Sequence, residues 1–174
     1  MKLIIGGAYQ GKVKYAKETY GVRDGWISGG ECTISEIGTC RGICQFHELV
    51  KRMLFADVRA IGSEEVNAGA NTEKTILREE SSIDHVKDEG NAALTVFDMG
   101  DLSKLEQQAE VFAEALYEKN PDIVIVSNEL GYGIVPMEKK DRMWREAVGR
   151  ICTALAARSD EVVRVVCGVG MRLK

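Results

Sequence analysis

The sequence lacks the features that mark a membrane, secreted or nucleic-acid-binding protein. No apolar run reaches the length of a membrane span, which takes about 20 residues, and no leader-like apolar stretch lies at the N-terminus. There is also no excess of basic residues, since the net charge is −4. Proteins that bind nucleic acid present a basic surface to the phosphates. We therefore expect a cytoplasmic protein with no membrane span and no nucleic-acid partner.

A disulfide framework is also missing, and histidine is scarce. The five cysteines are odd in number and widely spread, whereas disulfide frameworks use even sets of cysteines. Cys40 and Cys44 have no second pair nearby, so they indicate zinc only weakly. We expect free thiols, most of them buried. His47 and His85 are the two imidazoles that the sequence offers for catalysis.

The length and composition predict one folded domain over residues 1–174. With 174 residues, of which 45% are hydrophobic, the chain can bury a sizeable core. Residues 61–91 differ from the rest, because they hold eight carboxylates against three cationic side chains and few apolar anchors. Such a composition predicts a solvated excursion from the domain, and an acidic binding arm is the alternative.

The segment most informative about function lies near the N-terminus. It reads Gly6-Gly7-Ala8-Tyr9-Gln10-Gly11-Lys12-Val13 and matches the phosphate-binding loop G-x-x-x-x-G-K-[ST] except at its last position. In such a loop, backbone N–H groups and the lysine bind nucleotide phosphates, and the hydroxyl ligates Mg²⁺. Val13 cannot ligate a metal. The segment therefore predicts nucleotide binding more strongly than catalysis, and a glycine-rich turn is the alternative.

The order of elements around this loop is the one that phosphate binding requires. An apolar run at residues 3–5 predicts a strand before the loop, and residues 14–20 are expected to form a helix after it. The helix N-terminus would add its partial positive charge to the phosphate site.

Hydrophobic periodicity predicts further alternating elements along the chain. A capping box at Ser103 and Glu106 is expected to start one of the helices. The expected elements are a possible short strand within 21–34, a helix over 36–55, a strand at 92–97, a helix to Lys119, a strand at 123–126, a helix over 139–158 and a strand at 162–167. This order predicts an α/β fold with a doubly wound, mostly parallel sheet flanked by helices.

Polar residues follow the apolar strand at 123–126. Ligands of such sheets bind beyond the carboxyl ends of the strands, so Ser127, Asn128 and Glu129 are candidates for contact with phosphate or substrate. Glu129 is also the candidate ligand for Mg²⁺, and a role in fixing the loop is the alternative. On the next predicted helix, Arg142 and Arg145 share a face and are candidates for phosphate binding. Ordinary surface arginines are the alternative.

Several of these segments together resemble a known enzyme family. They are the Gly6–Lys12 loop, the segment VSNELGYGIVP at 126–136, and the C-terminal segments at 149–157 and 167–174. They resemble the bifunctional adenosylcobinamide kinase and adenosylcobinamide-phosphate guanylyltransferase family. The resemblance covers the two ends of the chain, and the 126–136 segment is its most specific part.

The resemblance implies a P-loop fold and a transferase that assembles the nucleotide loop of coenzyme B12. Such enzymes phosphorylate the aminopropanol hydroxyl of adenosylcobinamide with ATP or GTP, with Mg²⁺ as the expected metal. They then transfer GMP from GTP to adenosylcobinamide phosphate through a guanylylated histidine. By this resemblance, Lys12 would hold phosphates, and Glu129 would arrange the metal or the substrate.

The middle of the chain departs from the family pattern, because the family's histidine segment, with its neighbouring histidine and basic residues, is missing. His47 is the remaining candidate for guanylylation and a structural role is its alternative, while His85 lies in the acidic stretch, which repels phosphate. Asp24 is a candidate base-reading or metal-binding carboxylate. The alternatives to the enzyme are a non-catalytic nucleotide- or corrinoid-binding homologue and a kinase for another small alcohol. A homo-oligomer is left open.

Overall fold

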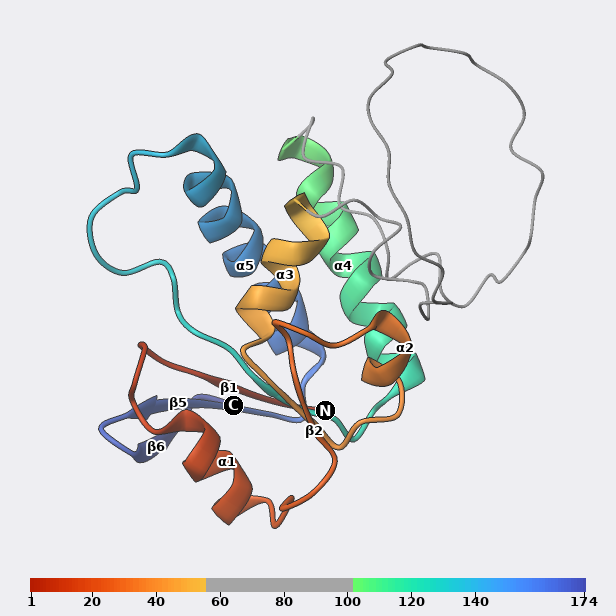
Figure 1. Cartoon of the computed structure of the whole chain (residues 1–174). Helices are drawn as coiled ribbons and strands as arrows, with labels where there is room; N and C mark the ends of the chain where they lie inside the picture. Colours follow the sequence, from red (N-terminus) through yellow and green to blue (C-terminus); the bar gives the residue numbers. More distant parts are fainter. Residues whose placement is uncertain (56–101) are drawn as a thin grey trace, which may run out of the picture.

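The computed structural model describes residues 1–55 and 102–174, and these two segments contribute to a single sheet (Figure 1). Six strands lie in the order β2-β3-β4-β1-β5-β6. The strands are β1 (Lys2–Ile5), β2 (Trp26–Ser28), β3 (Gly42–Cys44), β4 (Val124–Val126), β5 (Glu161–Val166) and β6 (Val169–Arg172). The helices are α1 (Lys12–Thr19), α2 (Ile34–Ile37), α3 (Phe46–Phe55), α4 (Leu102–Lys119) and α5 (Lys139–Arg158).

The sheet is mostly parallel, as the sequence predicts. β1 lies between β4 and β5 and is parallel to both, and β2, β3 and β4 continue the parallel arrangement. β6 was not predicted; it pairs antiparallel with β5. Between β5 and β6 the chain reverses at Cys167 and Gly168, whose φ angles are 50° and 81°. Two successive positive φ angles are typical of the tight turns that join antiparallel strands.

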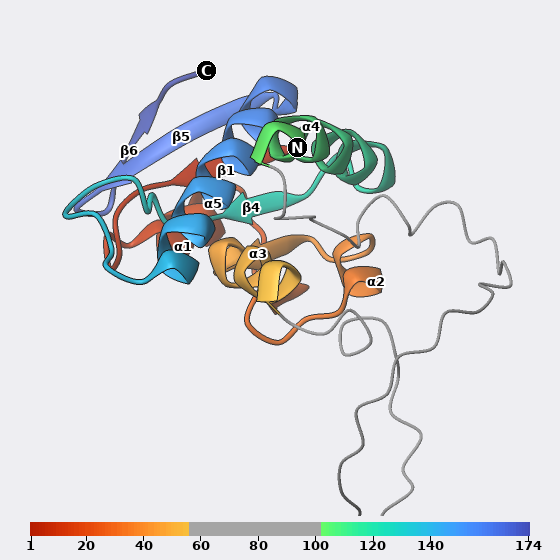
Figure 2. The ribbon, with the colours of Figure 1, turned by 90° about the horizontal axis from the view of Figure 1, so that it is seen from above.

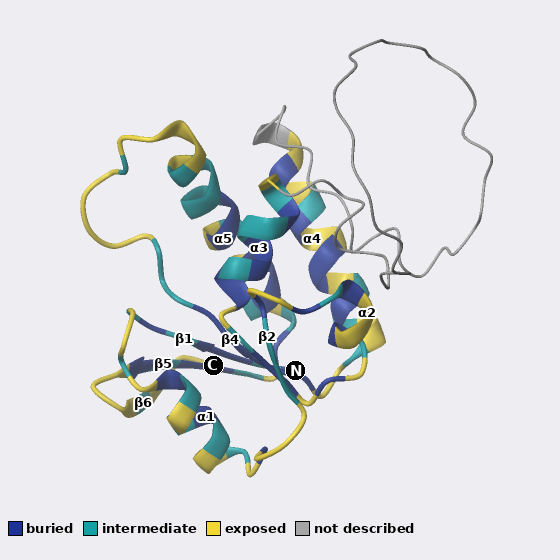
Figure 3. Ribbon diagram, viewed as in Figure 1, coloured by how far each residue is buried: buried dark blue, intermediate teal, exposed yellow. Residues whose placement is uncertain are grey.

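Helices cover both faces of the sheet (Figures 1 and 2). Since side chains alternate along a strand, Leu3 packs on the face covered by α3, α4 and α5, whereas Ile4 packs on the α1 face. Figure 3 shows the buried residues along the sheet and on the inner sides of these helices. β4 is buried throughout, as expected for a central parallel strand. The predicted helix at 139–158 is confirmed as α5.

The single helix predicted over residues 36–55 is wrong. This segment forms the short helix α2, the strand β3 and the helix α3. Gly42 begins β3, and a Cβ there would lie 2.8 Å from the ring of Trp26, so the close pairing of β2 with β3 requires glycine. Gln45 then turns the chain with a φ of 53°. Ile43 continues the helical spacing of the apolar residues in α3, which is why the hydrophobic periodicity wrongly predicted a single helix.

Smaller predictions have mixed outcomes. Because α4 starts at Leu102, Ser103 lies inside its first turn, and the predicted cap at Ser103 is wrong. The cysteines of the described segments are free, as expected, although Cys167 is exposed and Cys44 and Cys152 are only partly buried. No helix among the described residues is long and apolar enough to cross a bilayer. The excursion at 61–91, His85 and the predicted strand at 92–97 lie outside the described residues.

Candidate active site

The glycine-rich loop connects β1 to α1 at the carboxyl edge of the sheet. Gly6 and Gly11 have φ angles of 151° and 80°, which side-chain-bearing residues rarely adopt. A Cβ at Gly6 would also lie 2.4 Å from the carbonyl oxygen of Val165. α1 begins at Lys12, directly after the loop, so the N–H groups of its first turn face the loop. The arrangement is that of an anion site at a helix N-terminus.

The turn between β5 and β6 braces the tip of this loop. The backbone N–H of Cys167 donates to Gln10 Oε1 at 2.6 Å, and that of Gly168 donates to the Gln10 carbonyl oxygen at 2.9 Å. Tyr9, beside them, is fully exposed and has a φ of 59°. The unpredicted strand β6 therefore helps to hold the phosphate loop in shape.

Lys12 is buried within the loop that it follows. Its side chain donates to the carbonyl oxygen of Gly7, and its exposed fraction is 7%. Burial lowers the pKa of Lys12, and the nearby carboxylate of Glu129 acts in the opposite direction. Phosphate oxygens that enter the loop would replace the neutral Gly7 carbonyl as the partner of the Lys12 ammonium, and they carry negative charge.

The Ser127–Glu129 segment is attached to the loop through the backbone. The N–H of Ser127 donates to the Ile4 carbonyl oxygen, and that of Glu129 donates to the Gly6 carbonyl oxygen, each at 3.0 Å. The structure thus brings together two segments that are far apart in the sequence. It does so because β1 and β4 are parallel neighbours whose carboxyl ends meet.

Glu129 forms an ion pair that the sequence did not indicate. Its Oε2 lies 3.1 Å from Nε of Arg164 on β5, and the Arg164 guanidinium lies 5.1 Å from the ring centre of Tyr132. The Glu129 side chain is 15% exposed. One signal was available, since Arg164 is the single charged residue within the valine-rich run from Val162 to Val166.

His47 also reaches this edge of the sheet, and it is 7% exposed. Its Nδ1 accepts from the backbone N–H of Asn128 at 3.3 Å, and its Nε2 lies 3.0 Å from the Asn128 side-chain amide. The imidazole stacks against the Trp144 ring, whose Nε1 donates to the His47 carbonyl oxygen. Burial lowers the pKa of His47; Lys12 and Lys51 lower it further, whereas Glu48 raises it. The ring is therefore mostly neutral at pH 7.

These groups line a pocket of about 490 Å³. Its walls combine the phosphate loop with residues from β4 and the start of α3. The lining residues are Ala8, Tyr9, Gln10, Gly11, Lys12, Val13, Lys14, Gln45, His47, Glu48, Val126 and Asn128. Residues 8–13 of the predicted loop, Asn128 and His47 thus share one pocket, whereas the predicted site residues Gly6, Gly7, Ser127 and Glu129 do not line it.

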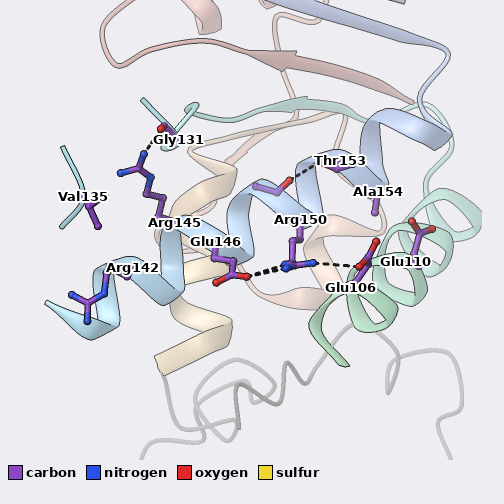
Figure 4. A pocket seen from close by; sticks show the side chains of 11 residues that line it. Glu106, Glu110, Gly131, Val135, Arg142, Arg145, Glu146, Arg150, Thr153 and Ala154 are labelled. Carbon is purple, nitrogen blue, oxygen red and sulfur yellow. Dashed lines mark hydrogen bonds and ion pairs between the residues drawn. The ribbon is translucent and has the colours of Figure 1, made fainter. Parts of the chain in front are cut away.

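The remaining predicted site residues lie elsewhere. Arg142 donates to the carbonyl oxygens of Pro136 and Met137, while Arg145 donates to those of Ile134 and Gly131. The two arginines therefore fix the loop that precedes α5. They line a separate cavity of about 690 Å³ between α4 and α5, beside the ion pairs of Arg150 with Glu146 and Glu106 (Figure 4).

Asp24 also lies away from the phosphate loop. It is exposed in the turn before β2, at the amino edge of the parallel strands, whereas the loop follows the carboxyl end of β1. It does not line the loop pocket.

Comparison with known proteins places the chain in a family. The family model described as cobinamide kinase / cobinamide phosphate guanyltransferase matches residues 64–173, well over half of the chain. The chain belongs to this family. The resemblance that the sequence motifs predict is thereby confirmed, and so is the P-loop α/β fold.

This chain is similar to three bifunctional adenosylcobalamin biosynthesis proteins over shorter segments. CobU of Salmonella typhimurium is 36% identical over 70 residues, which cover 40% of this chain and 39% of that protein. CobU of Escherichia coli is 44% identical over 52 residues, covering 30% and 29%, respectively. CobP of Pseudomonas aeruginosa is 35% identical over 74 residues, covering 42% and 43%. The chain thus aligns with less than half the length of the curated relatives it matches.

The part of this chain that the family model matches contains Asn128, Glu129 and Arg164. The phosphate loop at 6–13 lies before that part. The loop therefore supports nucleotide binding independently of the family match, through its spacing and its geometry.

Proposed function

We propose that the protein is a kinase of coenzyme B12 assembly that phosphorylates adenosylcobinamide with ATP or GTP. One observation carries the proposal: Lys12 of a phosphate loop and Asn128 of the VSNELGYGIVP segment line one pocket in a member of the cobinamide kinase / guanyltransferase family. The free thiols of the described residues agree with a cytoplasmic reaction, since the cytoplasm keeps cysteines reduced.

In this reaction the protein binds the nucleotide, orients the acceptor hydroxyl and neutralises charge on the phosphates. The loop N–H groups and Lys12 hold the phosphates, and the first turn of α1 adds its partial positive charge. The acceptor hydroxyl oxygen forms a bond to the γ-phosphorus while the bond from that phosphorus to the β–γ bridging oxygen breaks. The nucleoside diphosphate leaves, and the hydroxyl proton is released to water.

The residues present suit a magnesium ion that is held mainly by the nucleotide. The described residues contain no cluster of three or more potential metal-ligating side chains, and Val13 has no hydroxyl. Mg²⁺ needs only one or two carboxylates when phosphates and waters supply the other oxygens. Glu129 would provide that carboxylate once it separates from Arg164. The metal would neutralise charge on the phosphates.

Transfer of GMP, the second reaction that the family resemblance implies, is not favoured at His47. A neutral imidazole has one free lone pair, on the nitrogen that lacks the proton. Nδ1 lies 3.3 Å from the backbone N–H of Asn128, and Nε2 lies 3.0 Å from the Asn128 side-chain Nδ2, so the lone pair faces an N–H group of Asn128 in either tautomer. A nucleophile needs a lone pair aimed at phosphorus. We infer that His47 positions Asn128 and that the kinase reaction is the activity of this pocket.

The test is phosphoryl transfer from γ-labelled ATP or GTP to adenosylcobinamide by the purified protein. We expect labelled adenosylcobinamide phosphate from the wild type and a loss of at least about a hundredfold in kcat/KM for Lys12→Ala, because removing a phosphate-stabilising charge costs several kcal/mol. Lys17→Ala is the matched control, since Lys17 lies on the same helix outside the pocket. Nucleotide binding without any product would instead support the non-catalytic homologue.

A further inference from the structure

A third cavity adjoins the phosphate pocket, which is the pocket lined by the phosphate loop, His47 and Asn128, and no role has yet been assigned to it. It encloses about 470 Å³ between α5, the strands β1 and β5, and the C-terminal residues. Its walls are mostly apolar and include Leu3, Ile5, Leu130, Val148, Cys152 and Val162. A well-formed apolar cavity with a few polar groups at one end is typical of a small-molecule site.

Two polar residues of this cavity, Asn128 and Glu129, lie on the side of the phosphate loop, and Tyr132, Thr153 and Lys174 also line it. Asn128 lines both the apolar cavity and the phosphate pocket, so the two spaces share a wall. Glu129 also lines the apolar cavity and is attached through its backbone to Gly6. A molecule in the cavity could therefore present a hydroxyl to the phosphate pocket next to a carboxylate and an amide.

One cationic side chain on the cavity wall is already hydrogen-bonded to backbone groups. Lys174 lines the cavity, and its Nζ donates to the carbonyl oxygens of Ala156 and Ala157 near the C-terminus of α5. Helix C-termini favour cations. This ammonium is already bound, and the Thr153 hydroxyl donates to the Gly149 carbonyl oxygen. Asn128 and Glu129 are therefore the polar groups that the cavity offers next to the phosphate pocket.

We propose that this cavity binds the alcohol-bearing arm of the phosphoryl acceptor, with the hydroxyl at Asn128 and Glu129. The proposal rests on the kinase function given above and names the place of its acceptor. An aliphatic arm matches the apolar walls, and its hydroxyl matches the polar groups next to the phosphate pocket. A nucleotide base is a poor occupant, because it needs several hydrogen-bonding partners that these walls lack. The bulk of a large acceptor stays outside.

A larger side chain at Gly149 would fill part of the cavity without a backbone clash. Gly149 lies within α5 on the cavity wall, and a Cβ added there would meet nothing within 4 Å. Replacing a glycine inside a helix with alanine favours the helix, because alanine loses less backbone freedom on folding. Gly149→Leu therefore adds volume without a backbone clash, and Gly149→Ala is its matched control.

A second variant distinguishes effects of filling this cavity from effects on the cavity of about 690 Å³ that Arg142 and Arg145 line. Gly149 lines both cavities, whereas Ala156 lines the apolar one and is absent from the walls of the other. Ala156→Leu therefore fills the apolar cavity from another turn of α5. Circular dichroism and thermal melting show whether each variant is folded.

The experiment measures KM for adenosylcobinamide and for ATP in the wild type and the three variants. We expect Gly149→Leu and Ala156→Leu to raise the acceptor KM at least about tenfold, equivalent to about 1.4 kcal/mol, with the ATP KM changed less than about twofold. Gly149→Ala, which adds a single methyl group at the same position, should raise the acceptor KM less than Gly149→Leu does. Folded leucine variants with an unchanged acceptor KM, or with an effect on ATP instead, overturn the assignment of the cavity. A wild type that forms no product overturns the kinase function itself.

Discussion

Arg164 and Glu129 form an ion pair at the edge of the phosphate loop, with 3.1 Å between Nε and Oε2. The carboxylate of Glu129 interacts with a second cation too, because its charge acts to raise the pKa of Lys12. A metal ion that binds Glu129 must compete with Arg164. Under the proposed function, this competition and the missing hydroxyl at Val13 would both weaken Mg²⁺ binding, and each can be changed separately.

Replacing Arg164 with leucine should strengthen metal binding. The Arg164 side chain is 35% exposed, so its ion pair contributes on the scale of surface pairs, about 0.2–1 kcal/mol. We expect Arg164→Leu to lower the Mg²⁺ concentration for half-maximal kinase activity by about two- to fivefold. Arg164→Lys, which keeps the charge, is the control. The measurement is a Mg²⁺ titration at saturating ATP, and a higher Mg²⁺ requirement in Arg164→Leu would contradict this account of the pair.

Val13→Thr should supply the missing metal ligand. Val13 lines the phosphate pocket and is only partly buried against the α1 side of the core, so a hydroxyl there can face the nucleotide. We expect a lower half-saturating Mg²⁺ concentration and a kcat at least equal to that of the wild type, because the hydroxyl of this position ligates Mg²⁺ in phosphate loops. Val13→Thr replaces one methyl group with a hydroxyl, and Val13→Ala, which removes side-chain carbon without adding a hydroxyl, is the control. If both variants need equal Mg²⁺, the hydroxyl adds no ligand here.

Much of the phosphate site could be predicted because its signals are local. Loop spacing identified Gly6 to Lys12, and the apolar run before Ser127 placed Asn128 and Glu129 at a strand end. Parallel strands bring such ends to one edge of a sheet, which is a general property of the fold. The sequence therefore sufficed to predict which segments meet.

The parts that were missed depend on pairings between distant residues. Arg164 meets Glu129, 35 residues away, because β1 separates β5 from β4 with a particular register. Arg142 and Arg145 do share a helix face, but spacing cannot reveal that loop carbonyls fold back onto them. β3 was missed because a three-residue strand has too few alternations to be distinguished from the helix that follows it.

The burial of His47 predicts a pH-dependent stability. Because the pKa of His47 is lowered in the folded protein, a smaller fraction of His47 is protonated in the folded protein than in the unfolded chain at pH values just below 6.5. Stability contributed by the neutral ring is thus complete above that value and falls as the pH drops towards the native pKa, by at most about 1.4 kcal/mol per pH unit. We expect the Tm to fall between pH 7.5 and 5.5, and to fall less in His47→Asn. Equal slopes for both proteins would show that His47 does not cause the change.

The hydrogen bonds of His47 also predict that it is not guanylylated. Incubation with α-labelled GTP should leave no acid-labile, alkali-stable label on the protein, because neither ring nitrogen offers a lone pair to phosphorus in this arrangement. The same preparation should still transfer the γ-phosphate of GTP to adenosylcobinamide, which shows that the nucleotide reaches the pocket. His47→Asn should keep part of this kinase activity and show a higher KM for the acceptor, since Asn128 loses its support. A label that forms on the wild type and is absent from His47→Asn would instead identify His47 as the nucleophile, and would mean that the ring turns away from Asn128 when GTP binds.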